Sequence, residues 1–145
     1  MKIIIDTNVL VSAIIADGKP ENTVDFIMAK DDWEWIVSEP ILNEYRQVLN
    51  RPKFQKKLTD LVKQKWLNIL EEATTKVEVA VEVNFPRDRK DEKFLACAIV
   101  SQANFLITGD YDFEEMQALL PATTIISVAL FQELVINTGE DLSDN

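Results

Sequence analysis

The sequence predicts an α/β domain of three layers, in which helices cover both faces of a mainly parallel sheet. Short apolar segments of strand length alternate along the chain with longer segments of helical periodicity. The first of these strands, residues 2–6, is apolar on both faces, as strands of parallel sheets are. The chain has 145 residues, of which 47% are hydrophobic, so it can form one domain with a core that needs no disulfide.

The first part of the chain is expected to supply two helices and a second strand. After the first strand we expect a helix over residues 9–15 and a loop over residues 17–20, where glycine and proline interrupt the pattern. Asn22 or Thr23 is expected to cap the next helix. Residues 35–38 read Trp-Ile-Val-Ser, which predicts a second short strand.

Two longer helices and a third strand are predicted in the middle of the chain. The first helix begins at Ser38 or Glu39, with Pro40 in its first turn, where the missing N–H costs little. The second begins at Thr59. Its expected apolar face consists of Leu58, Leu61, Val62, Trp66, Ile69 and Leu70. Residues 77–83 carry valine at every second position, which predicts a strand.

The last part of the chain repeats the alternation. A helix is predicted over residues 90–102, a strand over 104–108, a short helix over 114–119 and a strand over 124–127. A closing helix runs through Leu134. In such a sheet ligands bind beyond the carboxyl ends of the strands, so acids at strand ends matter more than acids elsewhere.

Domain boundaries and compartment follow from composition. We expect one domain over residues 1–137 and a flexible acidic tail over residues 138–145, where glycine, serine and acids replace the apolar pattern. Asp6 interrupts the apolar start too early for a signal peptide. No apolar run approaches the roughly 20 residues that a membrane span requires. The expected location is the cytoplasm, with no membrane partner.

The residue types present exclude several kinds of chemistry. The chain contains no histidine, which excludes Ser-His-Asp catalysis, histidine-bound zinc and imidazole general bases. Its single cysteine, Cys97, lies among small and apolar residues and is expected to be a buried, inert thiol. Any catalysis must therefore come mostly from carboxylates, hydroxyls and a bound metal ion.

Several acids stand where such chemistry would be placed. Asp6 ends the first strand and Asp110 follows the strand over 104–108, although both could instead cap helices. Glu44 falls at the margin of an apolar helix face, where a flanking surface glutamate is the alternative. Asp91 and Glu92 open a helix, whose dipole stabilises acids in the first turn.

A second interpretation of the acids at the helix start is purely structural. Asp88 could be the N-cap of this helix and Asp91 its third residue, in a variant of the capping box. No single acid decides between the interpretations. Together, carboxylates that converge from strand ends and helix starts would suit Mg²⁺ or Mn²⁺, which prefer oxygen ligands.

Four segments resemble motifs of the PIN-domain family. They begin with Ile-Asp-Thr-Asn-Val-Leu at residues 5–10 and Pro-Ile-Leu-Asn-Glu-Tyr at 40–45. The third is Arg-Asp-Arg-Lys-Asp-Glu-Lys-Phe-Leu-Ala-Cys-Ala at 87–98, and the fourth runs from Ala103 to Phe113 around Thr-Gly-Asp-Tyr-Asp. Their order and spacing agree with the family over about residues 1–135.

The resemblance implies a Rossmann-like α/β/α fold and Mg²⁺- or Mn²⁺-dependent cleavage of single-stranded RNA. It implies that Asp6, Glu44 and Asp110 are catalytic residues that bind the metal ion or closely support the residues that bind it. The third-motif acid is Asp91 if chemistry prefers the shorter side chain, or Glu92 if the following Phe-Leu-Ala sets the register; we favour Asp91 and keep both.

The resemblance also suggests residues that support these ligands. Thr7, Asn8 and Thr108 are expected to hold the acids by hydrogen bonds, although the two threonines could simply cap backbone at strand ends. Asp112 is a candidate for a supporting acid, with the N-cap of the following helix as its alternative role.

The charge balance is unusual for a protein that binds RNA. The net charge is -10, whereas phosphate contacts come from lysine and arginine. Arg87, Arg89 and Lys90 adjoin the third motif and are the candidates for RNA contact. A second basic group is interpreted as solvated surface: Arg46, Arg51, Lys53, Lys56, Lys57, Lys63 and Lys65.

Within the family, the chain resembles the stand-alone, VapC-like ribonuclease toxins of toxin–antitoxin pairs. That resemblance implies an antitoxin protein as partner and a homodimer formed through helices. The alternative is a catalytically inactive PIN-fold protein that works only through protein contacts, which a change of one methylene group at the third motif would permit.

Overall fold

One sheet of five parallel strands forms the centre of the computed structural model, which describes residues 1–15, 19–109 and 113–137. The strands are short, as is usual for small α/β domains. They are β1 (Lys2–Ile5), β2 (Glu34–Val37), β3 (Thr74–Lys76), β4 (Phe105–Ile107) and β5 (Thr124–Ile126). Their order across the sheet is β3-β2-β1-β4-β5, and each neighbouring pair is parallel.

The strand order reverses next to β1. The chain moves from β1 outward to β2 and β3, then crosses to the other side of β1 and continues with β4 and β5. Ile3, Ile4 and Ile5 of β1 pair in register with β4, from Phe105 to Ile107. The carboxyl ends of β1 and β4 therefore meet at the point where such sheets bind ligands.

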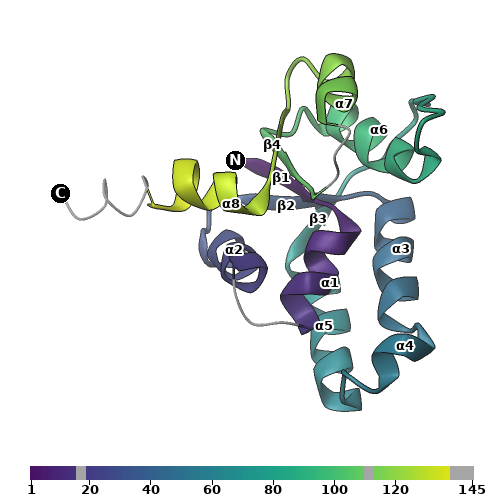
Figure 1. The fold of residues 1–145 in the computed structure, drawn as a ribbon, viewed down its shortest axis with the longest axis vertical. Coiled ribbons are helices and arrows are strands. Elements are labelled where there is room, and N and C mark those ends of the chain that lie inside the picture. The colour runs from purple at the N-terminus through teal and green to yellow at the C-terminus, as the bar shows by residue number, and fades with distance from the viewer. Residues whose placement is uncertain (16–18, 110–112, 138–145) are drawn as a thin grey trace.

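Helices lie on both sides of this sheet. In Figure 1, α6 and α7 lie on one side, and α1, α2 and α5 lie on the other. The α-helices are α1 (Thr7–Ile15), α2 (Lys19–Ala29), α3 (Glu39–Leu49), α4 (Pro52–Gln55), α5 (Asp60–Glu72), α6 (Glu92–Ser101), α7 (Phe113–Leu119) and α8 (Val128–Phe131). A 3-10 helix, η1 (Arg89–Asp91), precedes α6, and a π-helix, η2 (Gln132–Asn137), continues α8.

The first strand, β1, is the middle strand of the sheet and lies in the core. Ile3, Ile4 and Ile5 are all fully buried, so both faces of β1 are covered. This confirms the expectation from its continuous apolar run. The three-layer α/β/α arrangement predicted from the alternation of strands and helices is likewise present. Among the described residues, none of the helices is long and apolar enough to cross a membrane.

The predicted N-cap residues of α3 and α5 are found in the structure, but that of α2 is not. Ser38 is the N-cap of α3, with Pro40 in the first turn. The hydroxyl of Thr59 accepts a hydrogen bond from the N–H of Val62, as expected for the N-cap of α5. The predicted start of α2 at Asn22 or Thr23 is wrong, because the helix already begins at Lys19 and both residues lie inside it.

Two further predictions differ from the structure. Residues 77–83 do not form a strand, because β3 ends at Lys76 and only the N–H of Val77 still pairs, with the carbonyl of Val37. Beyond that bond β2 has ended, so the alternating valines have no neighbouring strand. Leu61 was expected on the buried face of α5, yet its side chain is 82% exposed.

Candidate active site

A cavity of about 370 Å³ opens at the carboxyl edge of the sheet and is lined by acids from three regions of the chain. Asp6 follows β1, Glu44 lies in α3, and Asp88 and Asp91 flank η1. We call this cavity the acidic pocket. Its other lining residues are Thr7, Asn8, Val48, Arg51, Lys90, Phe94 and Gly109.

Backbone hydrogen bonds connect Asp6 both to β4 and to α1. Its N–H donates to the carbonyl of Ile107 at 2.9 Å, which extends the pairing of β1 with β4. Its carbonyl accepts from the N–H groups of Val9 and Leu10, which begins α1. The side-chain carboxylate accepts a hydrogen bond from the hydroxyl of Thr108, with 2.6 Å between Oγ1 and Oδ2. This places a fixed carboxylate at the switch point of the sheet.

Glu44 reaches the same pocket from α3. One of its carboxylate oxygens accepts a hydrogen bond from the hydroxyl of Thr7, and the other forms an ion pair with the ammonium group of Lys93 at 2.9 Å. Thr7 and Thr108 thus each contact one predicted acid. Asn8 also lines the pocket and is exposed there, but its side chain forms no hydrogen bond to another described residue.

Tyr45 fixes α3 against the end of β1. Its side chain is fully buried, and its hydroxyl donates to the carbonyl of Ile5, directly before Asp6. Burial raises the pKa of the Tyr45 phenol well above its usual range, so the group remains a hydrogen-bond donor at neutral pH. This bond joins α3 to the end of β1 at the residues adjacent to Glu44 and Asp6.

The two candidate acids of the third motif point into different cavities. Asp91 is 8% exposed and lines the acidic pocket, and a small neighbouring cavity is lined by both Asp6 and Asp91. Glu92 accepts hydrogen bonds from the N–H of Phe85 at 3.1 Å and from Arg89 at 3.3 Å. The structure therefore brings Asp91, and not Glu92, together with Asp6 and Glu44.

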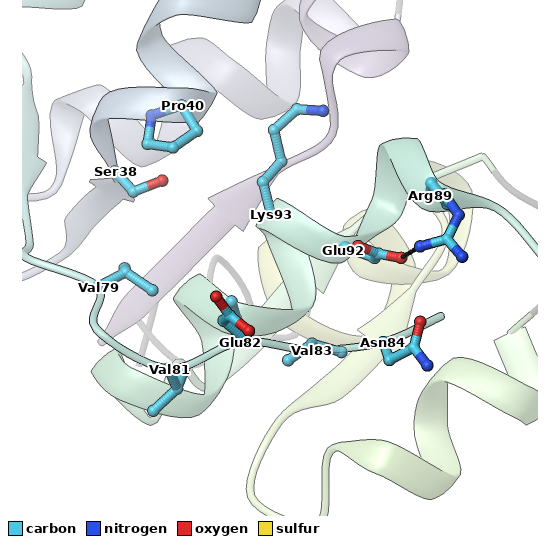
Figure 2. Close-up of a pocket in the computed structure, with 11 residues that line it drawn as sticks. Ser38, Pro40, Val79, Val81, Glu82, Val83, Asn84, Arg89, Glu92 and Lys93 are labelled. Atoms are coloured by element: carbon cyan, nitrogen blue, oxygen red, sulfur yellow. Dashed lines mark hydrogen bonds and ion pairs between the residues drawn. The ribbon is translucent and has the colours of Figure 1, made fainter. Parts of the chain in front are cut away.

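Glu92 lines a second cavity of about 710 Å³, which we call the side cavity. Figure 2 shows Glu92 joined to Arg89 on one wall, with valines of the segment after β3 on the other.

Asp88 has a role different from those of Asp91 and Glu92. Its carboxylate accepts a hydrogen bond from the N–H of Lys90 at 3.0 Å and so caps η1. The predicted capping role of Asp88 is therefore confirmed for η1, whereas the N-cap of α6 itself is Asp91.

The residues of the acidic pocket suit a hard divalent cation by their chemistry. Carboxylate oxygens are the ligands that Mg²⁺ and Mn²⁺ prefer, and here they share one cavity. One of these carboxylates already has a positively charged partner, since the ammonium group of Lys93 forms an ion pair with Glu44. Within the part of the chain that the structure describes, however, no three acids lie close enough together to hold an ion without side-chain movement. Asp110 and Asp112 lie outside the described residues.

The basic residues around the site divide into two kinds. Arg87 is paired with Glu115, and Arg89 with Glu92, so both already contact acids at the surface. Lys90 and Arg51 line the acidic pocket itself. Arg51 had been grouped with solvated surface residues, but it lies in the short connection between α3 and α4 and lines the acidic pocket.

Lys93 is the other residue that sequence reasoning passed over. It lies within the third motif at residues 87–98, but was given no role from the sequence. Its position in the first turn of α6, two residues after Asp91, was the available signal. No spacing rule relates it to Glu44, because the two residues come from different helices.

Comparison with known proteins gives a family match and matches to solved structures. A family model described as the PIN domain matches residues 2–112. A chain in a crystal structure described as VapBC2 from Rickettsia felis bound to a DNA fragment from their promoter superposes with a TM-score of 0.60. That match has 17% sequence identity and covers 88% of this chain and 98% of the other, which establishes similarity of fold. Among curated proteins, no sequence matches significantly.

Proposed function

The chain belongs to the PIN-domain family, and on this basis we propose that it is a Mg²⁺- or Mn²⁺-dependent endoribonuclease acting on single-stranded RNA. The observation that carries the proposal is the acidic pocket, where Asp6, Glu44 and Asp91 line one cavity at the switch point of the sheet. The absence of histidine supports it as well, because the chain must then rely on carboxylates for acid–base work.

Each acid has a proposed role in holding the metal. Asp6, Glu44 and Asp91 would be ligands, together with Asp110, which is carried over from the family motif. When bound, such an ion polarises a phosphodiester and lowers the pKa of a water molecule. Thr108 orients Asp6 and Thr7 orients Glu44 through the hydrogen bonds described above, which limits the movement that ligand binding requires.

Phosphate contacts are proposed for the cations nearest the acids. Lys90 and Arg51 line the acidic pocket, whereas Arg87 and Arg89 would have to exchange a surface ion pair for a phosphate. Such exposed pairs contribute little stability, so the exchange is feasible. If neutralising Lys90 and Arg51 together left the KM for RNA unchanged, this assignment would be wrong.

Two protein partners are also proposed. The similarity of fold to a chain of the Rickettsia felis VapBC2 structure supports a toxin of a toxin–antitoxin pair, with an antitoxin that binds over the acidic pocket. A homodimer formed through helices is the expected assembly of such a toxin. Co-expression with the protein encoded beside it, followed by purification of one complex, tests the antitoxin; two proteins that purify separately would contradict it.

The test of the proposed function is cleavage of a labelled single-stranded RNA by the full chain. We expect cleavage with Mg²⁺ or Mn²⁺, none with EDTA, and a loss of about a hundredfold or more for Asp6→Asn, as is typical when a group of the catalytic centre is removed. Asp60→Asn is the matched control, because Asp60 is an exposed acid in the first turn of α5 and should leave cleavage unchanged.

A different result would favour the catalytically inactive alternative. If wild type and Asp6→Asn were equally inactive with either metal, while the wild type still bound metal and a partner protein, the chain would be a PIN-fold interaction module. Activity that survives EDTA would instead contradict the metal-dependent mechanism, whichever acids are involved.

A further inference from the structure

Lys93 occupies a defined position between the two cavities. Its side chain is 21% exposed, and its nitrogen lies 2.9 Å from Oε1 of Glu44. The same nitrogen donates to the carbonyl of Lys90 at 2.8 Å and lies 5.5 Å from the centre of the Phe94 ring. In Figure 2 the side chain extends from α6 with its nitrogen directed away from Glu92 and Arg89.

The contacts of Glu44 show what this position means for a metal ion. Oε2 accepts from Thr7 and Oε1 is paired with Lys93, so one oxygen faces a hydroxyl and the other a full positive charge. A metal ion and an ammonium group that lie against the same oxygen repel each other, so each weakens the binding of the other. A metal ion that binds Oε1 of Glu44 therefore competes with Lys93 for that oxygen.

We propose that Lys93 is an internal counter-ion that competes with the metal for Glu44 and so sets the metal concentration at which the site becomes loaded. In the metal-free protein its charge offsets that of the pocket acids. The inference rests on the proposed function, because it presupposes a metal at these acids. Lys93 lies within the third motif segment but is not one of its acids, and the proposal gives it an effect on metal binding opposite to that of a residue that supports a ligand.

The geometry also explains how Lys93 could leave Glu44 without disturbing the fold. Its remaining contacts, to the carbonyl of Lys90 and the Phe94 ring, lie on its own side of the pocket. The side cavity, which Lys93 also lines, gives the side chain room beside α6. Displacement therefore needs a change of side-chain rotamer only.

The experiment measures Mn²⁺ binding to the full chain by calorimetry, for wild type and for Lys93→Met. Lys93→Met removes the ion pair that competes for Glu44, and we expect it to bind Mn²⁺ about threefold to tenfold more tightly than wild type. This range corresponds to the usual strength of a partly exposed ion pair. Lys93→Arg keeps the charge and should bind within about twofold of wild type, because a cation remains available to Glu44. Tighter binding by Lys93→Arg and Lys93→Met alike would overturn the proposal.

Lys90→Met is the matched control for charge alone. Lys90 lines the acidic pocket, but its ammonium group forms no ion pair with a described residue. Its removal should tighten Mn²⁺ binding by less than about twofold, because separated exposed charges are largely screened. An effect as large as that of Lys93→Met would mean that general electrostatics, and not competition at Glu44, is responsible.

Thermal melting gives a second measurement and checks that the variants fold. In EDTA, Lys93→Met should melt below wild type, because Glu44 loses its partner; with saturating Mn²⁺ the difference should disappear. Weaker or unchanged Mn²⁺ binding by Lys93→Met would overturn the inference and leave the proposed function standing. If wild type bound no Mn²⁺, or if Asp6→Asn bound it equally well, the metal site in the acidic pocket and the inference would both be wrong.

Discussion

Asp91 and Glu92 differ by one position and one methylene group, yet they serve different parts of the molecule. Asp91 ends the 3-10 turn η1 and faces the acidic pocket, while Glu92 begins α6 and binds the backbone of Phe85. One step along a helix turns the side chain by about 100°, so the exact start of the helix decides which acid reaches the pocket. The sequence pattern alone left both possible.

The two acids should therefore respond differently to loss of charge. We expect Asp91→Asn to lower RNA cleavage by about a hundredfold or more, as for other groups of the catalytic centre. Glu92→Gln should keep cleavage within about fivefold of wild type, because its amide oxygen can still accept from Phe85 and its exposed pair with Arg89 contributes little. Initial rates at saturating metal measure both, and the reverse order of effects would make Glu92 the third acid.

The burial of Cys97 was predicted from the small and apolar residues that surround it in the sequence. Cys97 was expected to be a buried thiol, and its side chain is fully buried in α6. Burial raises its pKa to about 11, so the thiol stays protonated and unreactive at neutral pH. The prediction succeeded because Cys97 lies within the buried stretch 94–98 of α6, whereas Ile99 and Val100 of the same helix are exposed although they are also apolar.

At the scale of elements, the sequence predicted those whose pattern reflects burial and missed those that depend on a neighbour. β1 and β4 are apolar on both faces and were found within a residue or two of their ends. The alternation of residues 77–83 looks like a strand, but β2 ends at Val37 and offers it nothing to pair with. Pairing is a property of two segments, which a single segment does not reveal.

The helix α5 shows the same limit for a helical face. The predicted apolar face included both Leu61 and Leu70, which lie nine positions apart. In the structure Leu70 is fully buried, whereas Leu61 is 82% exposed. Near its start the helix extends past the layer that it covers, so periodicity predicted the buried face of its second half only.

The two leucines give a matched test of this difference. We expect Leu70→Ala to lower the free energy of unfolding by about 2 to 5 kcal/mol, the usual cost of a cavity in a core. Leu61→Ala should change it by less than about 0.5 kcal/mol, as is usual for surface positions. Urea denaturation of the two variants measures both. A comparable loss for Leu61→Ala would mean that this side chain is covered in solution by another chain.

At the scale of the whole molecule, the net charge of -10 shapes association. Part of it belongs to the acidic pocket, where Lys90, Arg51 and Lys93 place positive charge beside the acids. This arrangement localises attraction for phosphate on a protein that repels RNA elsewhere. It also means that two copies of the chain repel each other at a distance.

The proposed homodimer should therefore depend on salt in a definite direction. Because screening weakens repulsion between two acidic chains, we expect the dimer to become tighter as salt is raised from about 0.05 to 0.5 M. Sedimentation or light scattering over a range of protein concentrations gives the dissociation constant. A dimer that salt weakens would point to an interface of paired opposite charges, and a monomer at every concentration would exclude the dimer.

The hydrogen bond from Thr108 to Asp6 joins residues 102 positions apart in the sequence. β1 is translated before β4, which pairs with it and carries Thr108 at its end. Contacts of such high sequence separation form late, because the ends of a long loop must first meet. A chain that lacks β4 therefore lacks the hydroxyl that fixes the carboxylate of Asp6 in the acidic pocket.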